Sequence, residues 1–128
     1  SNDTRMETIL DNLAFVYREQ GDYEKAQGVL KKSLDLDASI YGKDSQEVAK
    51  DANELALVLV AAGKFSDADI YFQQCLEIEK KVFGSSSLEV ADCLSNMAEM
   101  YRLQEKWTDV EKTLLEALSI RQEKLGQE

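Results

Sequence analysis

The chain contains no histidine and no proline, and only two of its 128 residues are cysteines. Imidazole is the commonest general base and metal ligand near neutral pH, so its absence excludes Ser-His-Asp and Cys-His catalysis and histidine zinc sites. The two cysteines, Cys75 and Cys93, cannot supply a four-cysteine zinc set or a disulfide framework. We therefore predict a non-catalytic chain with no metal ligands and no cofactor. We expect Cys75 to be a buried structural thiol, and we expect Asp92 to disfavour the thiolate form of Cys93 rather than activate this thiol.

Positive charge and long apolar runs are scarce as well. The 15 lysines and arginines are outnumbered by 25 aspartates and glutamates, which gives a net charge of −10. This balance repels nucleic-acid phosphates and anionic lipids. The best apolar run, Leu55 to Ala62, is far shorter than the about 20 residues that span a membrane. We expect a soluble cytoplasmic protein that inserts in no membrane and binds no nucleic acid.

What the sequence does contain is a repeat of 42 residues, of which three copies make 126. Internal repeats of this length are typical of arrays built from one supersecondary unit. Gly21 and Gly63 occupy one of the repeated positions, and Glu105 occupies the third copy of it. Similar residues recur at the same spacing in the sets Leu13, Leu55 and Met97; Ala14, Ala56 and Ala98; Tyr23, Phe65 and Trp107; Ala26, Ala68 and Val110; Leu34, Leu76 and Leu118; and Gly42, Gly84 and Gly126.

Each unit has the pattern of two helices. Leu10, Leu13, Ala14 and Tyr17 share one helical face, and Gly21 suits the left-handed position that ends a helix. Ser45 and Ser87 are good N-caps for the third and fifth helices. We predict an all-α chain with helices over 7–20, 23–41, 46–62, 65–83, 88–104 and 107–124. The units span 7–48, 49–90 and 91–126, after a frayed segment over 1–6 whose residues 1–2 are consistent with a cloning remnant.

The stretch Leu10-x2-Leu13-Ala14-x2-Tyr17, followed by Gly21, Tyr23, Ala26 and Leu30, resembles the tetratricopeptide repeat. That repeat is ordinarily about 34 residues long. The longer unit, with the linkers Tyr41-Gly42-Lys43-Asp44 and Phe83-Gly84, is similar to the kinesin light chain subfamily, although these linkers lack proline. The resemblance implies a right-handed α-solenoid of three helix-turn-helix units, about six antiparallel helices in all, that acts as an adaptor or scaffold for protein partners.

The resemblance also assigns ligand binding to the concave surface, which the first helix of each pair lines. Positions on this surface differ between units, whereas the core positions repeat. Amides can pair with a peptide backbone, and Arg18, Lys50 and Arg102 suit an acidic side chain or carboxylate of the partner, although acidic residues lie between them. We predict that the groove binds a peptide through Asp11, Asn12, Phe15, Arg18, Lys50, Asn53, Leu57, Asn96, Glu99 and Arg102.

The alternative function is that of a structural element that associates with itself through its ends. Leu115 stands where earlier units have Lys31 and Gln73, and no seventh helix covers it, so we expect an exposed apolar face on the last helix. We also expect Tyr23, Phe65 and Trp107 to fill the core.

The acidic residues of the second helices are expected to form a solvated convex surface. They are Glu24, Asp35, Asp37, Asp67, Asp69, Glu77, Glu79, Glu111 and Glu116.

Overall fold

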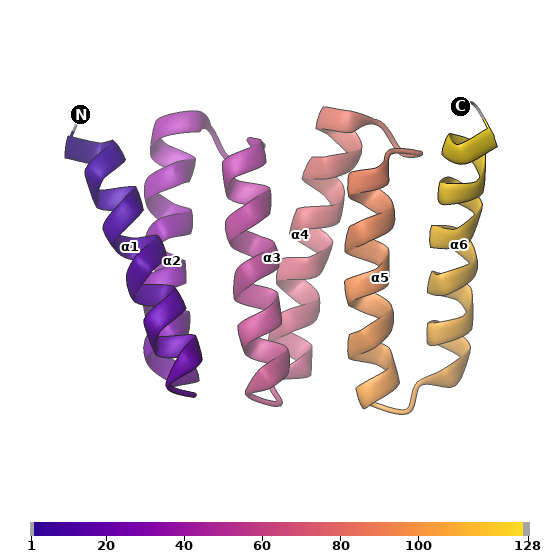
Figure 1. Ribbon diagram of the computed structural model, residues 1–128, viewed down its shortest axis with the longest axis horizontal. Helices are drawn as coiled ribbons and strands as arrows, with labels where there is room; N and C mark the ends of the chain where they lie inside the picture. Colours follow the sequence, from indigo (N-terminus) through magenta and orange to yellow (C-terminus); the bar gives the residue numbers. More distant parts are fainter. Residues whose placement is uncertain (1, 127–128) are drawn as a thin grey trace.

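The computed structural model describes residues 2–126, and over this range the chain is a row of six helices without a strand (Figure 1). Consecutive helices pack against one another in chain order, so the two termini lie at opposite ends of the row (Figure 1). The predicted all-α solenoid of three helix-turn-helix pairs is confirmed. The helices are α1 (Asn2–Glu19), α2 (Tyr23–Tyr41), α3 (Gln46–Ala61), α4 (Phe65–Phe83), α5 (Leu88–Leu103) and α6 (Trp107–Gly126).

Helix α1 differs from the expectation, because it begins at Asn2 rather than near residue 7. Residues 2–6 are therefore helical where a frayed segment was expected, and residue 1 lies outside the described range. No glycine or proline interrupts the chain before Gly21. In addition, the Tyr41 hydroxyl at the end of α2 donates a hydrogen bond to the Glu7 carboxylate at 3.2 Å. This contact ties the second turn of α1 to its neighbour.

The turns within the pairs share one backbone conformation. Gly21, Gly63 and Glu105 have φ angles of 74°, 77° and 58°, in the left-handed region that side chains other than glycine rarely adopt. Glu105 therefore carries a strain that the two glycines avoid. Between pairs, the predicted N-caps are confirmed, because Ser45 and Ser87 accept hydrogen bonds from the backbone N–H groups three residues later, at 3.3 and 3.2 Å.

The core consists of small and branched side chains at the repeated positions. Ala26 and Ala68 are completely buried, which lets neighbouring helices approach closely, and Leu30 and Phe72 occupy equivalent buried positions. The expectation of aromatic core residues at the start of each second helix is wrong for Trp107, which is 60% exposed, and for Tyr23, which is 36% exposed. These side chains lie at helix ends, where fewer neighbours cover them.

Candidate functional site

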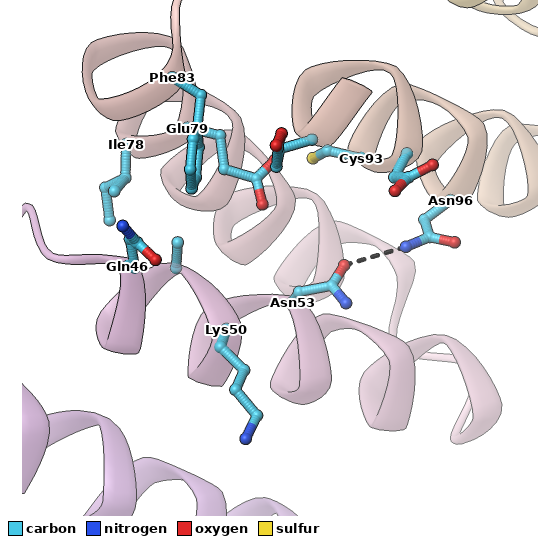
Figure 2. Close-up of a pocket in the computed structure, with 11 residues that line it drawn as sticks. Gln46, Lys50, Asn53, Ile78, Glu79, Phe83, Cys93 and Asn96 are labelled. Atoms are coloured by element: carbon cyan, nitrogen blue, oxygen red, sulfur yellow. Dashed lines mark hydrogen bonds between the residues drawn. The ribbon is translucent and has the colours of Figure 1, made fainter. Parts of the chain in front are cut away.

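A cavity of about 330 Å³ lies between α3, α4 and α5 (Figure 2). Lys50 and Asn53 of α3 line one wall and Asn96 of α5 lines another, while Phe83 contributes from the end of α4. Three of the predicted groove residues are therefore brought together around one hollow. Sequence reasoning missed Phe83, although it occupies the same repeat position as Tyr41 in the predicted linker.

The centre of this cavity wall is a pair of amides. Asn96 Nδ2 donates a hydrogen bond to Asn53 Oδ1 at 3.1 Å, which joins α5 to α3 across 43 residues of sequence (Figure 2). An amide carries two donors and an acceptor with two lone pairs. Within the described part of the chain, this bond leaves the Asn53 amide nitrogen and the Asn96 amide oxygen able to pair with a ligand. That is the donor and acceptor set of a peptide group.

The electrostatic sign of the cavity is negative. Its lining includes the carboxylates of Glu79, Glu89 and Asp92, of which Asp92 pairs with Arg121, beside the ammonium of Lys50. Figure 2 shows the Lys50 side chain extending away from Glu79. Burial is the largest cause that raises the pKa of Glu79, and the nearby charges of Glu89 and Asp92 raise it further, against a hydrogen bond from the Cys75 thiol. This cavity therefore disfavours the acidic ligand that the basic groove residues suggested.

A second cavity, of about 270 Å³, lies where α1 and α3 end. It brings together Arg18 and Leu57, two further predicted groove residues, with Tyr23 and Val58 beside them. Leu57 is 38% exposed, so its side chain offers apolar surface to a ligand. Arginine beside an apolar wall can bind either a carboxylate or an aromatic ring.

The remaining predicted residues line neither cavity. Arg102 Nε donates to Glu99 Oε2 at 2.9 Å within α5, and this pairing lowers the pKa of Glu99 and raises that of Arg102. The Arg102 charge is thus engaged by its own helix. Asp11, Asn12 and Phe15 are exposed on α1, where Phe15 has 60% of its surface in solvent. Their role in a groove stays a prediction.

The chain matches the family model described as Tetratricopeptide repeat twice, over residues 5–81 and 52–123. It belongs to the tetratricopeptide repeat family. Among the described residues of this repeat protein, no helix is both long and apolar enough to cross a membrane. Tetratricopeptide repeats are scaffolds for protein–protein interaction and are generally non-catalytic, which implies a protein partner.

Solved structures share the fold of this tetratricopeptide repeat chain. BtubC (BKLC) from P. vanneervenii is 27% identical, with a TM-score of 0.83 over 91% of this chain and 46% of that one. A kinesin light chain-type protein of Podosopora anserina with nearly identical TPR-like repeats is 18% identical, with a TM-score of 0.79 over 94% and 57% of the two chains. The TPR domain of Arabidopsis FLU is 22% identical, with a TM-score of 0.67 over 98% and 96%.

The kinesin-light-chain-like repeat type is thereby confirmed at the level of the fold. The chain spans about half the length of the first two of these structures. No curated protein matches it significantly.

Sequence reasoning missed a buried polar cluster at each of the two joints between repeat pairs. The first junction, between α2 and α3, consists of Ser33, Asp37, Glu47 and Asp51. The second junction, between α4 and α5, consists of Cys75, Glu79, Glu89 and Cys93. Each residue of the second junction follows its counterpart by 42 positions, so the repeat spacing could have revealed the pairing. At both junctions, carboxylate oxygens are buried without a hydrogen-bond partner among the described residues.

The first junction contains two neighbouring buried aspartates. Asp37 and Asp51 are 6% and 2% exposed, so the expectation that Asp37 lies on a solvated surface is wrong. Burial, a hydrogen bond with Asp37 and the charge of Asp37 raise the pKa of Asp51 to about 9. A raised pKa favours the neutral form of Asp51, and this form reduces the repulsion between the two carboxyl groups.

The second junction contains the two thiols. Cys75 and Cys93 are 1% and 2% exposed, so both are buried, which confirms the expectation for Cys75. Cys93 Sγ donates to the backbone oxygen of Phe72 at 3.7 Å. A hydrogen bond with Cys93, and then burial, raise the pKa of Cys75 above its ordinary value. The raised pKa favours the neutral thiol form of Cys75.

Proposed function

We propose that the chain is an interaction scaffold that holds an extended peptide segment of a partner protein in the groove beside α3 and α5. The observation that supports this best is the pairing of Asn53 with Asn96 at the wall of the cavity. The pair presents a donor and an acceptor from two different helices, which matches the alternating groups of an extended backbone. The units 7–48, 49–90 and 91–126 are our proposed division of the chain.

The charge of the site favours a basic segment. Glu79, Glu89 and Asp92 line the cavity, and the whole chain carries a net charge of −10. A lysine or arginine side chain of the partner, placed beside the amide pair, would meet complementary charge and would be steered toward it. Leu57 and Arg18 provide a second, partly apolar contact farther along the groove. A cytoplasmic location and the absence of nucleic-acid binding stay predictions.

A peptide-display selection on the purified chain tests this function. We expect the wild type to enrich a shared motif that contains lysine or arginine. The double variant Asn53→Ala, Asn96→Ala should bind the resulting peptide roughly tenfold to a hundredfold more weakly, because each lost hydrogen bond is worth about 0.5–1.5 kcal/mol. Gln73→Ala, an exposed amide of α4 outside this cavity, is the matched control and should bind like the wild type.

Two outcomes would contradict the peptide groove. One is a motif that binds the double variant as tightly as the wild type. The other is the absence of any enriched motif from a sample whose circular dichroism shows the full helical content. The separate variant Arg18→Glu, Leu57→Asp then reports whether the second cavity contributes to binding. The first change reverses a charge in this cavity and the second removes an apolar side chain.

A second candidate function is self-association through the outer face of α6. Leu114, Leu115 and Leu118 are 47%, 56% and 50% exposed there, as the sequence suggested. Apolar faces of this kind mark association surfaces. Sedimentation velocity at high concentration should then show dimers that Leu115→Lys disperses, lysine being the residue at the equivalent position 31. A monomer at every concentration removes this candidate.

A further inference from the structure

The second junction brings together three potential metal ligands from two different helices. The Sγ atoms of Cys75 and Cys93 and a carboxylate oxygen of Glu79 all lie within 4.8 Å of one another. Cys75 and Glu79 are four residues apart on α4 and so share a helical face, while Cys93 faces them from α5. The ligands of a tetrahedral zinc ion lie about 3.4–3.8 Å from each other, so about an ångström of side-chain movement closes the set.

Within the described range, each glutamate of this cluster has one carboxylate oxygen without a hydrogen-bond partner. Glu79 Oε2 and Glu89 Oε2 are buried and accept no hydrogen bond from the described residues. Buried carboxylate oxygens without partners are costly, and a cation is one of the few groups that can satisfy several of them together. Lys50 extends away from Glu79 (Figure 2), and Arg121 pairs with Asp92, so neither of these cations satisfies the two oxygens.

The cluster is reachable from solvent. Glu79, Glu89 and Cys93 all line the cavity of about 330 Å³ described above. Figure 2 shows the Glu79 carboxylate and the Cys93 sulfur on the same side of that hollow. An ion can therefore enter through the cavity, which also has room for a water molecule as a ligand.

We propose that Cys75, Cys93 and Glu79 bind one divalent cation of the zinc class, with Glu89 or a water from the cavity completing a tetrahedron. Sulfur ligands select zinc and its relatives over magnesium and calcium. On binding, the two thiols release their protons to solvent and bind as thiolates, and nothing is oxidised or reduced. The two thiols lose two protons and the site gains one divalent cation, so the net charge of the cavity is unchanged.

The proposed ion would fasten the joint between two repeat pairs. Helices α4 and α5 pack less extensively than α2 and α3, which form the equivalent joint. At that first junction, Ser33 Oγ and Asp51 Oδ1 lie 3.4 Å apart in place of the two sulfurs. The first junction is held by this hydrogen bond, whereas the second would respond to metal.

Titration of the reduced, chelator-treated chain with Co²⁺ tests the site. We expect thiolate-to-cobalt charge transfer in the near ultraviolet and tetrahedral bands in the visible, saturating at one ion per chain, with displacement by Zn²⁺. Cys75→Ser, which installs the residue of position 33, should abolish the charge-transfer band of the pair. Glu79→Gln should weaken binding by about tenfold or more. Glu77→Gln, an exposed glutamate of the same helix, is the control and should bind like the wild type.

Thermal unfolding gives a second measurement, in which Zn²⁺ should raise the Tm of the wild type and of Glu77→Gln but not that of Cys75→Ser. Cys75→Ala, with the residue of position 117, replaces the serine variant if that variant loses helical content. The proposal is overturned if no charge-transfer band forms, if the band survives the loss of Cys75, or if cobalt binds with the octahedral spectrum of surface carboxylates alone. The proposal is also overturned if an oxidant converts the two thiols to a disulfide but the chain binds no metal.

Discussion

The two junctions of the molecule have the same backbone register and different chemistry. Leu30 and Phe72 pack in equivalent places, and so do Val48 and Val90, all of them completely buried. The polar residues between them change from a serine and two aspartates at the first junction to two cysteines and a glutamate at the second. The comparison shows that both junctions keep large apolar side chains at the same buried positions, while the buried polar positions differ.

Removing the largest buried side chain should have the largest effect. Phe72→Ala should lower the free energy of unfolding by about 3–5 kcal/mol, and Leu30→Ala by about 2–5 kcal/mol, because each leaves a cavity at a completely buried site. Denaturation by urea measures both. Ile70→Ala, at a side chain 63% exposed, is the control and should change stability by no more than about 0.5 kcal/mol. A small loss from Phe72→Ala would show that the second junction is loosely packed.

Replacing the Asp51 carboxyl group by a neutral amide should change how the free energy of unfolding depends on pH. Folded Asp51 keeps its proton up to about pH 9, whereas the unfolded group loses it near 3.8. Between these values the folded state binds more protons, so the free energy of unfolding falls as pH rises, by at most about 1.4 kcal/mol per pH unit.

Asp51→Asn replaces the group by a neutral amide, so the variant should lose this slope and be more stable than the wild type above neutral pH. Urea denaturation from pH 4 to pH 9 gives the measurement, with exposed Asp67→Asn as the control. If the free energy of unfolding depends on pH in the same way in the wild type and in Asp51→Asn, Asp51 holds no proton in the folded chain.

Removing the helix caps should cost about the same stability at the two junctions. Ser45→Ala and Ser87→Ala should each cost about 1 kcal/mol, because each removes one hydrogen bond to the first turn of the following helix. Thermal unfolding at pH 7 measures both losses. A much larger loss at Ser87, which is the more buried of the two, would separate the junctions in their backbone as well as in their chemistry.

The smallest effect is expected outside both junctions, at the turn of the third pair. Glu105→Gly should raise the free energy of unfolding by about 0.5–1 kcal/mol, because glycine adopts the φ of 58° found there without strain. Gly63→Ala, at φ 77°, should lower it by a similar amount, and space for a methyl group exists at that position. If Glu105→Gly is neutral, the greater freedom of glycine in the unfolded chain has cancelled the gain.

The fold was largely predictable because it depends on periodic, local signals. The 42-residue spacing, the glycines and the serine caps placed five of the six helix starts at the residues where the structure has them. The start of α1 was missed because no glycine or proline interrupts the chain before Gly21, and the helix extends to Asn2. The site was predicted in part. Asn53, Asn96 and Lys50 meet in one cavity, whereas the Arg102 charge is engaged by Glu99 within α5.

The sequence by itself determined the architecture, because helix faces, turns and caps are set by residues within a few positions of one another. The tertiary structure alone decided which polar groups meet. Asp37 has the sequence context of a solvated residue and is buried against Asp51, and Cys75 meets Cys93 only because α4 packs on α5. The charge and ligand chemistry of such clusters depends on distances across helix joints, which a one-dimensional pattern does not contain.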